Sequence, residues 1–125
     1  SIHRLDHAVI KTNDPDGFIK IYRDAFGIRL ALDKFIEAWK KRMLFFRLNK
    51  TTIEVIEEGD SNLESHDTLW GLAWQVKDIR KTRKRLLKNN IDVTEIKNGI
   101  KDGTLVATLK SHNHNVPTLL IESKM

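Results

Sequence analysis

The two halves of this sequence repeat one pattern of elements, and this repetition is the feature that most limits how the chain can fold. Asp14 and Asp78, each placed to cap a helix, are 64 positions apart. The residues that can end those helices in a left-handed conformation, Gly27 and Asn90, are 63 apart. A spacing this constant predicts two copies of a single structural unit.

The first copy begins with alternating residues from Leu5 to Ile10, which predict a strand. Asp14 and Pro15 then predict a helix start, because proline needs no backbone donor in the first turn. The expected helix carries its apolar residues on one face and ends at Gly27. They are Phe18, Ile19, Tyr22, Ala25 and Phe26.

Two further strands complete the first copy. Met43–Leu48 and Thr52–Glu57 flank Asn49-Lys50, which predicts a hairpin. Residues 31–43 fit either a strand edge with a loop or a turn of helix. Residues 59–67 are rich in Gly, Ser, Asn and acids, so they read as a linker.

The second copy follows the linker with the same order of elements. Residues 71–78 predict a strand, Asp78 caps a helix with Ile79, Leu86 and Leu87 on its apolar face, and Asn90 ends it. Strands follow within 99–111 and 112–123. The sequence therefore predicts an α+β fold of two βαβββ modules, about 1–60 and 67–125, within one domain. Because neither module can close its own apolar face, the two sheets should pair around a shared concavity.

Composition narrows the class of protein further. The 125 residues are 40% hydrophobic and 31% charged, without a run near the roughly 20 apolar residues that span a membrane. The N-terminal residues lack the apolar region of a signal peptide, so we expect a cytoplasmic protein without membrane association. The absence of cysteine excludes disulfides, thiolate metal ligands and cysteine nucleophiles.

The net charge of +5 is concentrated on the second predicted helix. Such a charge can indicate an anionic partner such as nucleic acid. No aromatic and basic motif for stacking bases accompanies these residues, which favours a solvated helix face and makes a nucleic-acid partner the weaker interpretation. The residues are Arg80, Lys81, Arg83, Lys84, Arg85 and Lys88.

The arrangement resembles the vicinal oxygen chelate superfamily, which includes glyoxalase I, bleomycin-resistance proteins and extradiol dioxygenases. The segments that carry the resemblance are 5–30, 51–58, 70–93 and 116–122. The resemblance implies a glyoxalase-like fold of paired modules, with a cupped mixed sheet, helices on its outer face, a cavity for a small organic ligand and commonly a homodimer.

In metal-using relatives, a divalent ion takes ligands from the first and fourth strand of each module. His7 and Glu54 match those positions in the first module and supply imidazole and carboxylate ligands. The repeat pairs them with Leu72 and Leu119, which cannot coordinate a metal. Gln75, Glu57 and Glu122 lie three residues from the mapped positions and should face the other side of the sheet. We therefore expect the metal site to be degraded or absent.

His7 and Glu54 remain the candidate catalytic pair. A buried carboxylate is costly without a partner, and an imidazole with a carboxylate can remove a proton next to a carbonyl even without metal. A histidine hydrogen-bonded inside the cavity and an exposed glutamate are the structural alternatives. The expected ligand-contacting residues are Trp74, Leu72, Leu119, Phe45 and Lys101.

For the other polar and aromatic candidates, a functional role is the weaker interpretation. Arg42 and Arg47 could meet an anionic substrate, but solvated charges at strand edges are the simpler interpretation. His112 and His114 lie in an expected turn without a third ligand, and Lys101 lies in a loop that reads as a plain turn. Trp39, Trp70 and Phe46 fit ordinary core or interface packing as well as a cavity wall.

Two functions follow from this sequence. The first is a glyoxalase-like enzyme of lyase or isomerase type for a small carbonyl or diol substrate, with His7 and Glu54 as the reactive pair and a divalent ion held weakly or not at all. The alternative is a non-catalytic protein that binds small molecules such as drugs in an aromatic and aliphatic cavity, or a dioxygenase-like relative.

Overall fold

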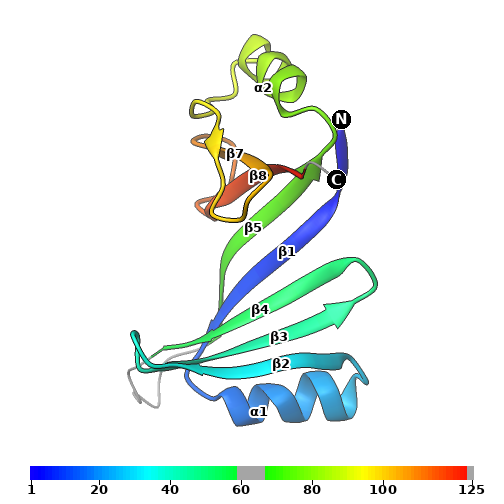
Figure 1. The fold of residues 1–125 in the computed structure, drawn as a ribbon, viewed down its shortest axis with the longest axis vertical. Coiled ribbons are helices and arrows are strands. Elements are labelled where there is room, and N and C mark those ends of the chain that lie inside the picture. Colours follow the sequence, from blue (N-terminus) through cyan, green and yellow to red (C-terminus); the bar gives the residue numbers. More distant parts are fainter. Residues whose placement is uncertain (59–66, 124–125) are drawn as a thin grey trace. The chain divides into compact units, whose positions relative to one another are not determined.

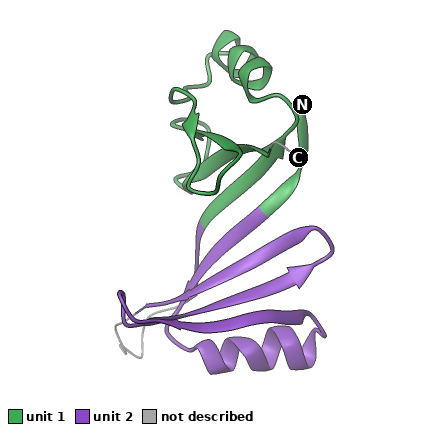
Figure 2. Ribbon diagram, viewed as in Figure 1, with its two compact units in different colours: residues 1–6, 71–125 green, residues 7–70 purple. Residues whose placement is uncertain are grey.

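The computed structural model describes residues 1–58 and 67–123, and within these residues the chain forms two compact units. Unit 2 comprises residues 7–70 and unit 1 comprises residues 1–6 with 71 onward (Figure 2). The predicted linker lies outside the described residues except for Asp67. Each unit contains the predicted order of strand, helix and three strands, and the predicted α+β fold is confirmed.

Unit 2 is a four-stranded sheet with a helical segment on one face (Figure 1). Its strand order is β2-β3-β4-β1, in which β1 and β4 are parallel and β2, β3 and β4 form antiparallel pairs. The element bounds are β1 (Ile2–Thr12), α1 (Pro15–Ile19), η1 (Lys20–Ala25), β2 (Arg29–Ile36), β3 (Lys41–Leu48) and β4 (Thr51–Glu57). Residues 31–43, left open by the sequence, form most of β2, a turn and the start of β3.

The first helix starts where predicted but does not continue as a regular α-helix. The Asp14 carboxylate accepts a hydrogen bond from the Gly17 backbone N–H at 3.0 Å, and Gly27 has a φ of +74°. Between them, Lys20–Ala25 is a π-helix, in which each turn holds more residues than the 3.6 that the pattern assumed. Ala25 is consequently exposed and Phe26 is 62% exposed, so the predicted place of both on the buried face is wrong.

The core of unit 2 lies between this helix and one face of the sheet. Phe18 stacks on Tyr22 with ring centroids 4.0 Å apart, and both rings contact Phe46, which is fully buried. The other buried members of the cluster are Ile19, Leu44 and Val55. Apolar burial of this kind is the main favourable term in folding.

Unit 1 repeats the arrangement with its own strands. Its order is β1-β5-β8-β7-β6, with β1 contributing its first residues. The bounds are β5 (Thr68–Val76), α2 (Ile79–Lys88), β6 (Lys97–Asn98), β7 (Thr104–Leu109) and β8 (Thr118–Ser123). The core lies under α2 and comprises Val76, Ile79, Val93, Ala107 and Leu120.

The start and end of α2 agree with the sequence. The Asp78 carboxylate accepts from the Lys81 N–H at 3.0 Å, and Asn90 is left-handed with a φ of 63°. The buried face of α2 differs from the predicted one: Thr82 is buried beside Ile79, whereas Leu87 is 41% exposed. No helix among the described residues is long and apolar enough to cross a membrane.

Candidate functional site

His7 and Glu54 lie on one face of the unit 2 sheet, on neighbouring strands. In the register of β1 and β4, His7 pairs with Thr52 and Val9 pairs with Glu54. Paired residues project to the same face, and residues two apart along a strand share a face. The two candidate catalytic side chains are therefore diagonal neighbours, at a Cα separation on the order of 7–8 Å, within reach of long side chains.

This face is opposite α1 and is called here the helix-free face of unit 2. Ile53, Val55 and Phe46 project to the other side, where they belong to or pack on the core beneath the helix. His7 and Glu54 are both half-buried. Phe45 pairs with Glu54 across β3 and β4, so the predicted ligand contact lies beside the predicted carboxylate.

Unit 1 carries no imidazole or carboxylate at the corresponding positions. Ala73 pairs with Leu119 as Val9 pairs with Glu54, so Leu119 is the counterpart of Glu54, as the sequence predicts. The same register makes Gly71, and not Leu72, the counterpart of His7. The assignment of Leu72 is wrong because the modules are offset by 64 residues on their first strands and by 65 on their fourth.

This shift of one residue reverses the expected direction of two side chains. Leu72 and Trp74 share a face, as predicted, but Trp74 pairs with the buried Leu120 and packs against the core beneath α2. Leu119 lies on the other face. The expectation that these side chains line one cavity wall with Leu119 is therefore wrong, and their role in ligand binding stays a prediction.

Each alternative metal donor already has a partner in the structure. Gln75 faces away from Leu72, as expected, and lies on the face of Ala73 and Leu119, where its Oε1 accepts from Arg4 Nε at 2.7 Å. Glu57 accepts from the Arg42 backbone N–H at 3.0 Å, and Glu122 accepts from the Ile79 N–H at 2.9 Å.

The residues of this chain do not complete the superfamily type of metal site. His7 and Glu54 supply two donors, whereas Gly71 and Leu119 supply none. Within residues 1–58 and 67–123 there is no group of three His, Cys, Asp or Glu side chains that could hold a metal ion. Two protein ligands hold a divalent ion weakly, since catalytic zinc sites use three.

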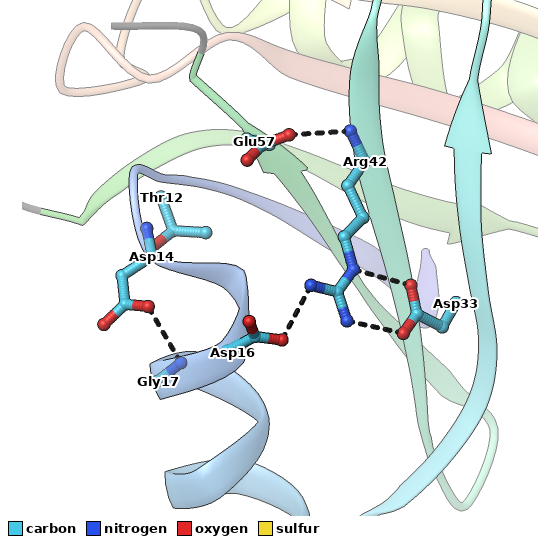
Figure 3. Close-up of polar contacts among 7 residues, drawn as sticks. All are labelled: Thr12, Asp14, Asp16, Gly17, Asp33, Arg42 and Glu57. Carbon is cyan, nitrogen blue, oxygen red and sulfur yellow. Dashed lines mark hydrogen bonds and ion pairs between the residues drawn. The ribbon is translucent and has the colours of Figure 1, made fainter. Parts of the chain in front are cut away.

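A polar cluster occupies the other side of unit 2, at the start of α1 (Figure 3). Arg42 donates two hydrogen bonds to the Asp33 carboxylate, at 2.8 and 2.7 Å, and a third to Asp16 at 2.7 Å. The bonds raise the pKa of Arg42 and hold the pKa of Asp33 below its usual value, against the opposing effect of burial. The forked pairing ties β2 and β3 to the helix.

The cluster borders a hollow of about 670 Å³ that Asp14, Lys20 and Asp24 also line. The hollow lies on the helix side, whereas His7 and Glu54 project from the helix-free face. Its arginine is already bound to two carboxylates, so we interpret it as a structural groove. We therefore interpret Arg42 as a structural residue and not as a substrate contact.

Lys101 lies at a separate hollow in unit 1. A cavity of about 370 Å³ is lined by the end of β6 and the loop before β7, including Asn98, Lys101 and Gly103. The Thr104 hydroxyl donates to the Lys101 carbonyl at 2.5 Å, which closes the loop as a turn. The Lys101 side chain is exposed there. Its binding role stays a prediction.

The remaining candidates have ordinary structural surroundings. Trp39 and Trp70 are 58% and 46% exposed, and the Lys11 ammonium lies 4.8 Å from the Trp70 ring centroid. Ser111 hydrogen-bonds to His112 Nδ1 at 2.8 Å. On α2, Arg83 donates to the Thr94 carbonyl, while the other basic side chains of the helix are exposed, as expected of a solvated face.

Comparison with known proteins identifies the class. Residues 6–108 match the Glyoxalase/Bleomycin resistance protein/Dioxygenase superfamily, and the chain belongs to this superfamily. Its resemblance to the glyoxalase group, predicted from the sequence, is confirmed. A comparison with curated proteins gives no match.

Solved structures share the fold at low sequence identity. Methylmalonyl-CoA epimerase from Mycobacterium tuberculosis is 18% identical, with a TM-score of 0.67 over 99% of this chain and 90% of that one. A hypothetical protein from Bacillus halodurans is 18% identical, with a TM-score of 0.68 over 98% and 95%. A Streptomyces coelicolor methylmalonyl-CoA epimerase variant in complex with 2-nitronate-propionyl-CoA is 18% identical, with a TM-score of 0.66 over both whole chains.

Proposed function

We propose that this chain is an isomerase or lyase that moves a proton on the carbon next to a carbonyl group of a small organic substrate. One observation carries the proposal: an imidazole and a carboxylate, His7 and Glu54, project from neighbouring strands to the helix-free face of unit 2. Proton transfer by a positioned side chain contributes about 10²–10⁴-fold to a rate.

The two side chains divide the work of such a reaction. His7 accepts the proton from the substrate carbon, since a ring nitrogen of neutral imidazole has a lone pair that can take up a proton. Glu54, one diagonal step away, favours the imidazolium that forms, because an opposite charge nearby stabilises it. Protonation of the resulting carbanion by solvent on the other side of the carbon inverts its configuration, and the abstracted proton passes from His7 to solvent. Loss of a neighbouring leaving group completes an elimination instead.

A thioester is the first substrate class to test. The similar solved structures include enzymes named methylmalonyl-CoA epimerases, one of them in complex with a propionyl-CoA derivative. The carbon next to a thioester carbonyl carries an acidic proton of the required type. The expected homodimer is likewise a proposal, which light scattering of the purified protein tests.

Hydrogen exchange in heavy water tests the proposal directly. Methylmalonyl-CoA and simple acyl thioesters are incubated with the protein in D₂O, and mass spectrometry follows deuterium at the carbon next to the carbonyl. We expect incorporation with the natural chain and its loss in His7→Ala. His3→Ala, which removes an exposed histidine from the same strand, is the matched control and should retain exchange. No exchange with any carbonyl substrate would contradict the proposal.

A non-catalytic binding protein is the second candidate. The face of unit 1 opposite α2 favours it, because Leu119 and Ile121 are partly exposed there and carry no acid or base. A ligand that binds only the folded protein raises its melting temperature. Stabilisation by aromatic or cationic drugs that is the same in His7→Ala, together with absent exchange, would favour binding over catalysis.

A further inference from the structure

Two arginines face each other across β2 and β3 on the same helix-free face as the proposed reactive pair. Arg29 pairs with Arg47, Arg47 pairs with Thr52, and Thr52 pairs with His7. Because paired residues share a face, these four side chains form one row, with one residue on each strand of unit 2.

Like charges directly opposite each other destabilise a sheet. Both side chains are exposed, and among the described residues neither arginine has an ion-pair partner. The other two arginines of unit 2 differ: Arg23 pairs with Asp24 at 2.8 Å, and Arg42 pairs with two aspartates. The two arginines without carboxylates are therefore the two that lie opposite each other.

One of these guanidinium groups is already oriented along the row. Arg47 Nη1 donates to the Thr52 hydroxyl oxygen at 2.7 Å, which directs the side chain from β3 toward β4, the strand next to His7. The remaining N–H groups of both arginines can donate to an anion. Guanidinium is suited to this role because its planar fork matches the oxygens of carboxylate and phosphate groups.

We propose that Arg29 and Arg47 form an oxyanion subsite for the far end of the substrate whose reacting carbon lies at His7 and Glu54. The position of the reacting carbon at His7 and Glu54 rests on the proposed function. Neighbouring strands are about 4.8 Å apart, so the row from β3 to β1 spans about 10 Å. The substrate class is an elongated carbonyl compound that carries a phosphate or carboxylate at about that distance from the reacting carbon.

Anion binding tests the subsite without any catalytic assay. Inorganic phosphate and succinate are titrated at constant low ionic strength, and both the melting temperature and the Nε–Hε signals of the arginines are followed. We expect saturable binding by the natural chain and at least about tenfold weaker binding in Arg29→Gln and Arg47→Gln. Arg80→Gln removes the same charge from an exposed position on α2 and should bind as the natural chain does.

The choice of probe identifies the anion. Stronger binding of phosphate indicates a phosphate at the far end of the substrate, and stronger binding of succinate indicates a carboxylate. An equal loss in Arg80→Gln would overturn the subsite, because it would show diffuse attraction by net charge. The absence of saturable binding to either probe would overturn it as well.

Two further measurements separate this inference from its alternatives. In buffer without polyvalent anions, Arg29→Gln should melt at the same or a higher temperature than the natural chain, since the opposed charge is relieved; a lower temperature would indicate a merely structural arginine. His7→Ala should still bind phosphate or succinate. In the natural chain, anion binding without exchange activity would count against the proposed function alone, whereas exchange without anion binding would count against the subsite alone.

Discussion

The two units have the same architecture but different chemistry on their helix-free faces. In unit 2 that face presents His7, Glu54 and a pair of arginines, whereas the matching positions of unit 1 include Gly71 and Leu119. The helix sides are alike, since each helix covers an apolar core. The repeated fold therefore determines where side chains project, and among the described residues the imidazole and the carboxylate at these positions belong to unit 2.

The largest expected effect comes from removing the carboxylate that distinguishes the units. Glu54→Gln should lower the rate of exchange or turnover by up to about 10⁴-fold, because a neutral amide stabilises the imidazolium much less than a carboxylate does. Leu119→Gln, which places the same amide at the matching position of unit 1, should leave the rate within a few-fold. Kinetics of both variants on a thioester provide the measurement. Equal losses would mean that the reactive group is not confined to unit 2.

Matched deletions in the two cores test whether the units depend on each other. Phe46→Ala should lower the free energy of unfolding by about 3–5 kcal/mol and Leu120→Ala by about 2–5 kcal/mol, since both side chains are fully buried. Strand β1 contributes residues to both units, so we expect one cooperative urea transition in each variant. Two separate transitions would show that the units unfold independently.

The two helices begin differently, and the sequence predicts only part of this difference. Both helices have the predicted aspartate cap. In α2, the N–H of the first residue, Ile79, also donates a hydrogen bond to the Glu122 carboxylate, whereas the first residue of α1 is Pro15, which has no N–H. Glu122→Ala should therefore cost about 1–3 kcal/mol, because it leaves the N–H of a buried residue unsatisfied. Asp14→Ala should cost about 1 kcal/mol.

Thermal or urea unfolding of these two variants gives the comparison. Glu122→Gln keeps a carbonyl acceptor at the same position and should recover most of the loss. A smaller cost for Glu122→Ala than for Asp14→Ala would contradict the assigned role of Glu122 as the second cap of α2.

Local signals in the sequence were sufficient for most of the fold. Caps, left-handed stops and the hairpin at Asn49 depend on short-range chemistry, and the structure has each of them. The π-helix and the bulge between Leu30 and Leu32 have no comparable signal in the sequence. Each adds one residue to a helical turn or to a strand, and the residue types there are the same as in a regular helix or strand. The bulge decides that Leu32 faces Phe45 while Asp33 reaches Arg42.

The candidate site was predictable only where the register could be read. His7 and Glu54 belong to one module, so alternation along each strand places them on one face. Their counterparts required an alignment between modules, and a difference of one residue in offset moved the counterpart of His7 from Gly71 to Leu72. The row of Arg29 and Arg47 could have been found from the sequence only with the strand pairing in hand.

The smallest expected effect is a pH dependence confined to unit 2. Arg42 lowers the pKa of Asp33, so this pair contributes stability above the ordinary carboxyl pKa of about 3.9 and loses it as the pH falls through the lower folded value. Asp33→Asn should cost less than about 1 kcal/mol at neutral pH, because the pair lies at the surface where solvent screens it, and the difference from the natural chain should shrink below about pH 4. Asp24→Asn is the control: its partner Arg23 is the adjacent residue, so the pair constrains no tertiary contact and its removal should change stability less. Urea unfolding from pH 2.5 to 7 measures both, and a difference for Asp33→Asn that grows toward acid would show that the Arg42 pair does not stabilise the folded state.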